Sequence, residues 1–371
     1  SKDARARAVQ LPAWNEALGL PRQWDQQWSL RMQQILAYET DLLEFEDIFE
    51  GSHVIEAKTR ELVEGAKAEL KLIDSMGGAV AAVERGYMKE ALVNSNRLRV
   101  GAIERGDIKV VGVNAYTESE PSPLYGQEEN ASIEKVGEHV EGEQIARLKA
   151  WRAQRDARAA AKALEDLAAA AREDRNIMEP SIACAKTGVT TGEWGETLRK
   201  VYGEFRAPTG VALVVSSDGD EDIEKVKADV AALSEKLGRN LTFLVGKPGL
   251  DGHSNGAEQI AARGRAVGMD VVYEGIRLTP AEIVAAAKEK RAHVIGLSIL
   301  SGSHLDLVRD VVRLLREAGL EKTPVIVGGI IPPADALALK QMGVAGVYTP
   351  KDFRITGIMG DVVKVVEKAN L

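Results

Sequence analysis

A glycine-rich segment, Lys247–Gly256, holds the residues of this 371-residue chain best suited to chemistry. Its residues are Lys-Pro-Gly-Leu-Asp-Gly-His-Ser-Asn-Gly, so Asp251 and His253 stand two positions apart. In locally extended backbone such residues lean to the same side. The carboxylate could then accept a hydrogen bond from one imidazole nitrogen while the other nitrogen faces a metal, as is common around metal-bound histidines. The same residue types also form turns and helix caps, so the pair alone does not decide.

The elements around this segment indicate an α/β fold. From residue 210 onward, strand and helix patterns alternate, which predicts a doubly wound parallel sheet. The expected strands are Val211–Val215, Leu241–Val245, Asp270–Glu274, His293–Ser298, Val325–Gly328 and Gly346–Tyr348. The expected helices are Glu221–Leu237, Ala257–Val267, Ala281–Lys290, Leu305–Ala318, Asp335–Met342 and Val362–Lys368.

The unusual loops of this part fall at one edge of the expected sheet. In flavodoxin-like strand order, ligands bind at the switch point outside the carboxyl ends of the strands. Besides Lys247–Gly256, that edge would carry Ser298–His304, which is rich in small residues, and the pair Gly328-Gly329, which permits close backbone approach. Neither a Walker A loop nor a Rossmann fingerprint is present. Three converging loops predict a large planar or branched ligand.

The first two-thirds of the chain has a helical pattern. Helices are expected at Trp28–Leu43, Ile55–Met76, Val80–Arg85 and Lys89–Arg105, with a helical pair within Asn176–Phe205. Residues 115–140 are polar and contain proline, which indicates a linker or a wrapping arm. The segment Glu143–Ala171 is long, Ala-rich and charged. We interpret it as a solvated helix rather than a coiled coil or a nucleic-acid arm, because its charges alternate without a sustained heptad.

Composition narrows the classes of partner. The net charge is −8 and the acidic residues are spread along the chain, which argues against nucleic acid or an anionic membrane. The single cysteine, Cys184, excludes an internal disulfide and fits the cytoplasm. No apolar run is long enough to cross a bilayer, and no signal peptide pattern is visible. The first residue is Ser, so we expect a processed, trimmed or partial chain.

The pattern Asp251-x-His253-x-x-Gly256, followed by Ser298-x-Leu300 and Gly328-Gly329, resembles the cobalamin-binding signature of base-off, His-on corrinoid enzymes. The earlier part agrees with one branch of these enzymes, the adenosylcobalamin-dependent acyl-CoA mutases that resemble methylmalonyl-CoA mutase. The segments similar to the end of their (β/α)8 barrel and its linker are Asn15–Pro21, Met76–Gly78, Val111–Asn114 and Gln144–Leu148. The resemblance covers nearly the whole chain.

This resemblance implies roles for particular residues. His253 would be the lower axial ligand of cobalt, Asp251 would bind the other imidazole nitrogen, and Lys247 would lie near Asp251. The remaining cofactor contacts it implies are Gly252, Gly256, Ser298, Leu300, Gly302, Gly328, Gly329 and Glu16. It assigns no catalytic residue. We expect His293 to be an interior or edge residue, and His304 is a further candidate for the cofactor.

The resemblance also implies an activity, reversible carbon-skeleton rearrangement of an acyl-CoA with adenosylcobalamin. An extra strand–helix unit, Val211–Leu237, favours ethylmalonyl-CoA, converted to methylsuccinyl-CoA, over methylmalonyl-CoA. The expected domains are 1–110, the end of the barrel with following helices; 111–208, a helical linker; and 209–371, the cobalamin-binding domain. The expected partners are the acyl-CoA substrate, the remaining barrel portion and a second copy of the complete enzyme. The alternatives are a corrinoid carrier or sensor, and a nucleotide-binding response module.

Overall fold

The computed structural model describes residues 11–16, 20–118, 120, 137, 139–209 and 221–370. The chain forms two compact units, one made of Ser1–Glu134 with Ala207–Leu371 and the other of Lys135–Arg206. The expected strand Val211–Val215 lies outside the described residues. Of the helices in the described ranges, none combines the length and the apolar character that a bilayer crossing requires.

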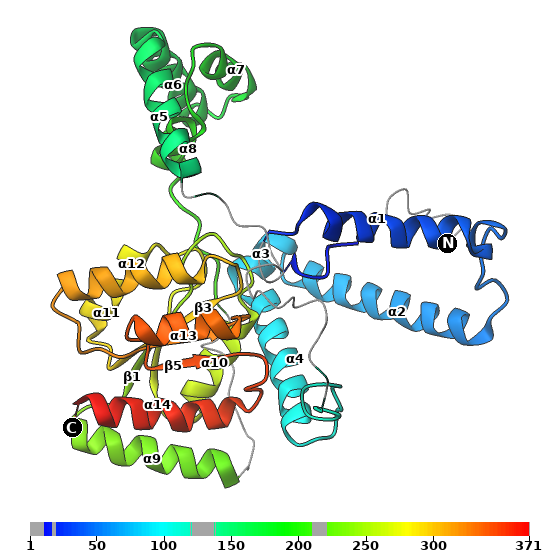
Figure 1. Cartoon of the computed structure of the whole chain (residues 1–371). Helices are drawn as coiled ribbons and strands as arrows, with labels where there is room; N and C mark the ends of the chain where they lie inside the picture. The colour runs from blue at the N-terminus through cyan, green and yellow to red at the C-terminus, as the bar shows by residue number, and fades with distance from the viewer. Residues whose placement is uncertain are drawn as a thin grey trace. The chain divides into compact units, whose positions relative to one another are not determined.

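The first unit contains a parallel sheet of five strands in the order β2-β1-β3-β4-β5 (Figure 1). The strands are β1 Thr242–Gly246, β2 Asp270–Tyr273, β3 Val294–Ile299, β4 Val325–Gly329 and β5 Gly346–Tyr348. The expected flavodoxin-like order is therefore confirmed, with β1 and β3 at the switch point. Each strand ends at the edge where the glycine-rich and serine-rich loops begin.

Helices cover both faces of the sheet, because successive residues of a buried parallel strand face opposite sides. On one face Phe243 and Val245 of β1 join a core with α9 Glu221–Leu237, α10 Asn255–Ala266 and α14 Ile355–Asn370. On the other face Leu244 joins a core with α11 Pro280–Lys290, α12 His304–Glu317 and α13 Pro333–Gln341. In Figure 1, α9 and α14 lie side by side on the first of these faces.

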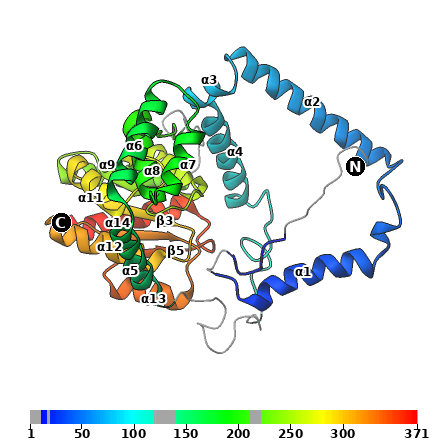
Figure 2. The same ribbon diagram turned by 90° about the horizontal axis from the view of Figure 1, so that it is seen from above.

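The N-terminal helices of this unit are α1 Gln23–Tyr38, a 3-10 turn at Asp41–Leu43, α2 His53–Ser75, α3 Ala79–Glu84 and α4 Tyr87–Glu104. Helix α1 begins before the expected Trp28, because the carboxylate of Asp25 accepts from the backbone N–H and the guanidinium of Arg22 and so fixes its first turn. Helix α2 is a single unbroken helix of 23 residues (Figure 2). Both α1 and α2 expose many large apolar side chains, among them Leu30, Met32, Ile35, Leu36, Leu62 and Leu70.

The second unit consists of α5 His139–Gln154, α6 Ala157–Arg172, α7 Met178–Lys186 and α8 Thr191–Tyr202. The expectation of one long solvated helix over Glu143–Ala171 is wrong. The chain turns after Gln154, and Asp156 caps a new helix by accepting from the backbone of Arg158. Helix α6 then buries Leu167 and several alanines against α7 and α8. The small side chains of this alanine face let neighbouring helices approach closely, a packing signal that the charge pattern conceals.

Candidate functional site

The loop after β1 is held to the sheet before it reaches the helix. The backbone N–H of Leu278 donates to the carbonyl of Lys247 at 3.1 Å, and the N–H of Gly249 donates to the carbonyl of Leu278 at 3.0 Å. Gly249 has φ +85°, where an L side chain is strained, and an added Cβ would lie 2.9 Å from Leu307. This turn directs the chain across the carboxyl end of the sheet toward Asp251.

A buried ion pair stands at the centre of the loop. Lys247 is fully buried, and its Nζ donates to Oδ2 of Asp251 at 2.7 Å. Burial alone would raise the pKa of Asp251, but hydrogen bonds from Lys247 and His253 outweigh it and hold that pKa well below its usual range. Asp251 is therefore a carboxylate at neutral pH and can act only as a hydrogen-bond acceptor.

His253 is placed at the surface by this carboxylate. Its backbone N–H and its Nδ1 lie 3.0 Å and 2.6 Å from Oδ1 of Asp251. Because the carboxylate has no proton to give, Nδ1 carries the hydrogen in this contact, and Nε2 is the ring nitrogen left to face a ligand. The side chain of His253 is 73% exposed. Nε2 is therefore available to a ligand, and the hydrogen bond from Nδ1 to Asp251 fixes the tautomer of the ring.

The loop after β3 joins the same cluster. The N–H of Leu300 donates to Oδ2 of Asp251 at 3.2 Å, and Nζ of Lys247 lies 3.4 Å from the carbonyl of Ser298. A Cβ on Gly256, in the first turn of α10, would lie 3.7 Å from Oγ of Ser298. Five of the residues expected from the sequence, Lys247, Asp251, His253, Ser298 and Leu300, are thus linked by hydrogen bonds.

The two glycines at the end of β4 differ in their surroundings. A Cβ on Gly329 would come within 1.8 Å of the carbonyl oxygen of Ile299, so β3 and β4 require glycine there. A Cβ on Gly328 would meet no atom within 4 Å, so space is open beside it. Gly252 and Gly302 take no part in the hydrogen bonds that join the loops. Glu16 is exposed and makes none of them either.

The two other histidines close to the sheet, His293 and His304, have partners inside the protein. His304 is buried, with Nε2 at 2.8 Å from Asp335 and Nδ1 at 3.3 Å from the carbonyl of Ser301. His293 accepts from the backbone N–H of Thr242 at 2.9 Å. Its pKa falls to about 4, because burial and the nearby Arg239 both disfavour the charged ring. The interior position expected for His293 is confirmed, and His304 supports the serine-rich loop.

Sequence reasoning missed Lys89, a residue of α4 that reaches this site. Its Nζ donates to Oγ of Ser254, next to His253, and to Oε1 of Glu258, each at 2.8 Å. Lys89 and Ser254 are 165 positions apart, and a single lysine on an amphipathic helix gives no sign of such a contact.

Comparison with known families decides the relationship of the chain. The family model described as methylmalonyl-CoA mutase matches residues 5–204, more than half of the chain. The chain belongs to the methylmalonyl-CoA mutase family. A second model, described as B12 binding domain, matches residues 241–352, which include all five strands and the three loops. The resemblance stated from the sequence is confirmed.

Individual relatives within this family differ in similarity. The chain is 62% identical over 370 residues to an ethylmalonyl-CoA mutase of Methylorubrum extorquens, covering 100% of this chain and 53% of that one. It is 58% identical to an ethylmalonyl-CoA mutase of Cereibacter sphaeroides, covering 100% of this chain and 56% of that one. Identity to a methylmalonyl-CoA mutase of the same organism is 34%, over 93% of this chain and 48% of that one. The chain thus spans about half the length of the curated relatives it matches.

The residues present fit a cobalamin. A corrin-bound cobalt needs one axial donor from the protein, and His253 offers an exposed imidazole nitrogen supported by a buried carboxylate. The nucleotide tail of the cofactor needs a slot, and there is open space beside Gly328 at the end of β4, the strand next to β3.

Proposed function

We propose that this chain binds adenosylcobalamin through the loops after β1, β3 and β4, as part of an acyl-CoA mutase that converts ethylmalonyl-CoA to methylsuccinyl-CoA. The observation that carries the proposal is the hydrogen-bonded series Lys247–Asp251–His253, which ends in an exposed imidazole inside a matched B12 binding domain. The choice of ethylmalonyl-CoA rests on the 62% identity to an ethylmalonyl-CoA mutase, against 34% to a methylmalonyl-CoA mutase. Methylmalonyl-CoA is the alternative substrate.

Each residue has a distinct part in this proposal. His253 would hold cobalt through Nε2, Asp251 would fix the ring by accepting from Nδ1, and Lys247 would keep Asp251 ionised. Residues without bulky side chains would leave room for the cofactor's nucleotide tail beside Leu300; they are Gly252, Gly256, Ser298, Gly302, Gly328 and Gly329. Glu16 would contact the adenosyl ribose. When bound, adenosylcobalamin supplies the radical chemistry that a carbon-skeleton rearrangement needs.

The substrate site requires more than the described elements. All strands among the described residues belong to the one sheet β1–β5, and a (β/α)8 barrel needs eight of its own. We infer that residues 1–110 are the end of such a barrel, 111–208 a linker and 209–371 the cobalamin domain. The rest of the relatives' length would supply the barrel that binds acyl-CoA. The exposed apolar faces of α1 and α2 are suited to packing against it.

The complete enzyme would act as a homodimer in the cytoplasm. The cytoplasmic location rests on Cys184, a buried free thiol of a kind that persists in reducing surroundings. A corrinoid carrier or sensor without a reaction of its own is the second candidate function. It would not need the N-terminal half that matches the mutase model, which favours the mutase.

The axial ligand is tested by the absorption and paramagnetic resonance spectra of bound cobalamin. With the parent chain we expect the base-off, His-on form, and with His253→Ala the loss of that signature together with weaker binding. His53→Ala, at the start of α2, is the matched control and should leave the spectrum unchanged. Unchanged axial ligation in His253→Ala would overturn the proposal.

A further inference from the structure

Helix α4 is joined to α10 by polar side chains that a free-standing sheet domain would expose. Three residues on one side of α10, Glu258, Gln259 and Arg263, are at most 8% exposed. Glu258 binds Lys89, Nε2 of Gln259 donates to the carbonyl of Val93 at 3.1 Å, and Arg263 binds Glu104 at 3.2 Å. Buried polar groups need such partners, and here α4 provides one for each of the three.

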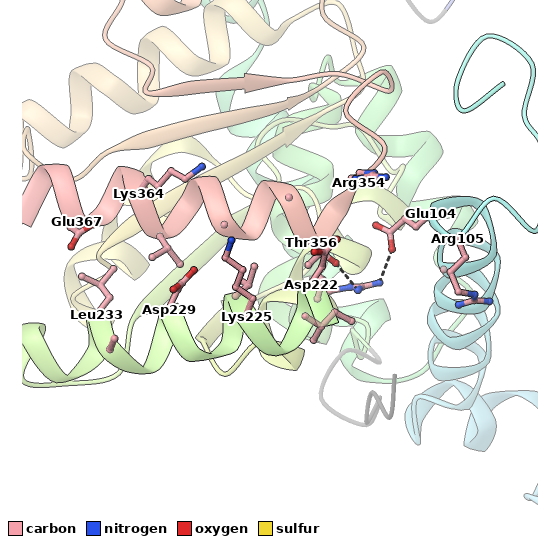
Figure 3. A pocket seen from close by; sticks show the side chains of 18 of the residues that line it. Glu104, Arg105, Asp222, Lys225, Asp229, Leu233, Arg354, Thr356, Lys364 and Glu367 are labelled. Carbon is pink, nitrogen blue, oxygen red and sulfur yellow. Dashed lines mark hydrogen bonds and ion pairs between the residues drawn. The ribbon is translucent and has the colours of Figure 1, made fainter. Parts of the chain in front are cut away.

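The far end of α4 is fixed as firmly as its beginning. Glu104 accepts from the guanidinium of Arg263 and, at 2.7 Å, from the backbone N–H of Ile355. Arg263 also donates to Oγ1 of Thr356 at 2.9 Å, so α4, α10 and α14 meet at one point (Figure 3). Glu104, Arg263 and Thr356 also line a cavity of about 1180 Å³, together with residues of α9 and α14. Val93, midway along α4, is fully buried in the core of the sheet.

Lys89 lies in the first turn of α4, at the other end of the contact with α10, beside the loop after β1 that carries His253. It is the described side chain that joins α4 to Ser254, the residue directly after His253. Ser254 is 7% exposed and precedes the first residue of α10 without capping the helix with its own hydroxyl. Its hydroxyl is therefore free to accept from the ammonium group. A charged donor makes this hydrogen bond stronger than a neutral one.

We propose that Lys89 is a positioning residue for His253, acting through Ser254. This inference rests on the proposed function. Asp251 holds the ring of His253 from one side of the residue, and Lys89 holds the backbone on its other side through Ser254. With both restraints the exposed imidazole is held in one place before the cofactor arrives. Helix α4, which belongs to the region matched by the mutase model, thereby positions His253, the proposed cobalt ligand in the B12 binding domain.

The test uses Lys89→Met, which removes the charge and keeps the unbranched stem. We expect a roughly tenfold larger dissociation constant for cobalamin, equivalent to about 1.4 kcal/mol of binding free energy. We also expect a smaller His-on fraction in the spectrum at saturation. Lys58→Met, which breaks an exposed ion pair of α2, is the matched control and should leave both unchanged. Parental affinity and spectrum in Lys89→Met would overturn the proposal.

A double variant separates positioning from simple neutralisation of Glu258. Lys89→Met leaves the carboxylate of Glu258 buried and unpaired, so that variant loses stability as well. Adding Glu258→Gln removes the charge, and we expect stability to recover while the His-on fraction stays low, since Ser254 is still untethered. Full recovery of the spectrum in the double variant would assign Lys89 a structural role only. A parent chain without a His-on spectrum would instead refute the proposed function.

Discussion

At the scale of single residues, the buried ion pair Lys247–Asp251 decides whether the site exists before any cofactor binds. Asp251→Ala would leave the ammonium group of Lys247 fully buried without its carboxylate. Removing one partner of a buried pair costs about 3–5 kcal/mol of unfolding free energy, whereas replacing both with apolar groups is often nearly neutral. We therefore expect Asp251→Ala to be strongly destabilised and the double variant Asp251→Ala/Lys247→Met to recover most of the loss. Urea unfolding without cofactor measures both.

If the single variant costs less than about 1 kcal/mol, the level of an exposed ion pair, water reaches Lys247 and the loop is not preorganised.

His293 gives the sheet domain a predictable sensitivity to acid. Its pKa is about 4 in the folded chain, against 6.5 for an ordinary histidine. The stability that depends on the neutral ring is fully present above pH 6.5 and is lost as pH falls toward 4, because only the unfolded chain takes up the proton in that window. The loss approaches about 3 kcal/mol at 1.36 kcal/mol per pKa unit.

The variant His293→Asn tests this origin. Its side-chain oxygen can accept from the backbone of Thr242 as Nδ1 does now, but it does not titrate. We expect the slope of unfolding free energy against pH to flatten between pH 6.5 and 4. An unaltered slope would assign the acid sensitivity to other groups.

At the scale of elements, the end of β4 makes a matched pair of glycines. Gly329→Ala places a methyl group against the carbonyl of Ile299, its partner residue in the parallel register with β3. We expect a loss of about 1–3 kcal/mol in unfolding free energy, or more if the strands must separate. Gly328→Ala meets nothing in the free protein and should fold normally, yet it should weaken cobalamin binding if the tail slot lies there.

Thermal unfolding of both variants checks the expected stabilities, and a cobalamin titration of both checks the expected affinities. Normal cobalamin affinity in Gly328→Ala would place the slot elsewhere along the loop edge.

At the scale of the whole molecule, cofactor binding and turnover are expected to separate. The B12 binding domain is present from β1 to β5, so the chain should bind cobalamin by itself. Turnover needs a closed, water-free cavity of the kind an eight-stranded barrel supplies, whereas the described strands form one five-stranded sheet. We expect no conversion of ethylmalonyl-CoA by these 371 residues with adenosylcobalamin, and conversion once a polypeptide corresponding to the rest of the relatives' length is added.

The control is methylmalonyl-CoA under the same conditions, which should be the poorer substrate. Substantial turnover by the 371-residue chain alone would show that a complete active site is present within it.

The sequence by itself determined the fold of the last 130 residues and the centre of the site. The parallel direction of the strands followed from alternating apolar runs and helices, since parallel strands need a crossover each time. The flavodoxin-like order was assumed as the usual arrangement of such a sheet, and the order β2-β1-β3-β4-β5 agrees with it. Asp251 and His253 could be paired from their spacing, because residues two apart share a side in extended chain. The loops at Ser298 and Gly328 followed from topology, since carboxyl ends of parallel strands meet at one edge.

Only the tertiary structure decided which distant residues support that centre. Lys89 bonds to Ser254 across 165 positions, and His304 bonds to Asp335 between two helices of one layer. The burial of α6 against α7 and α8 was also missed, because its alternating charges indicate a solvated helix although its apolar residues gather on one face. Local spacing and periodicity describe neighbours within one element, whereas these contacts depend on how separate elements pack, and that packing leaves no repeating mark in the sequence.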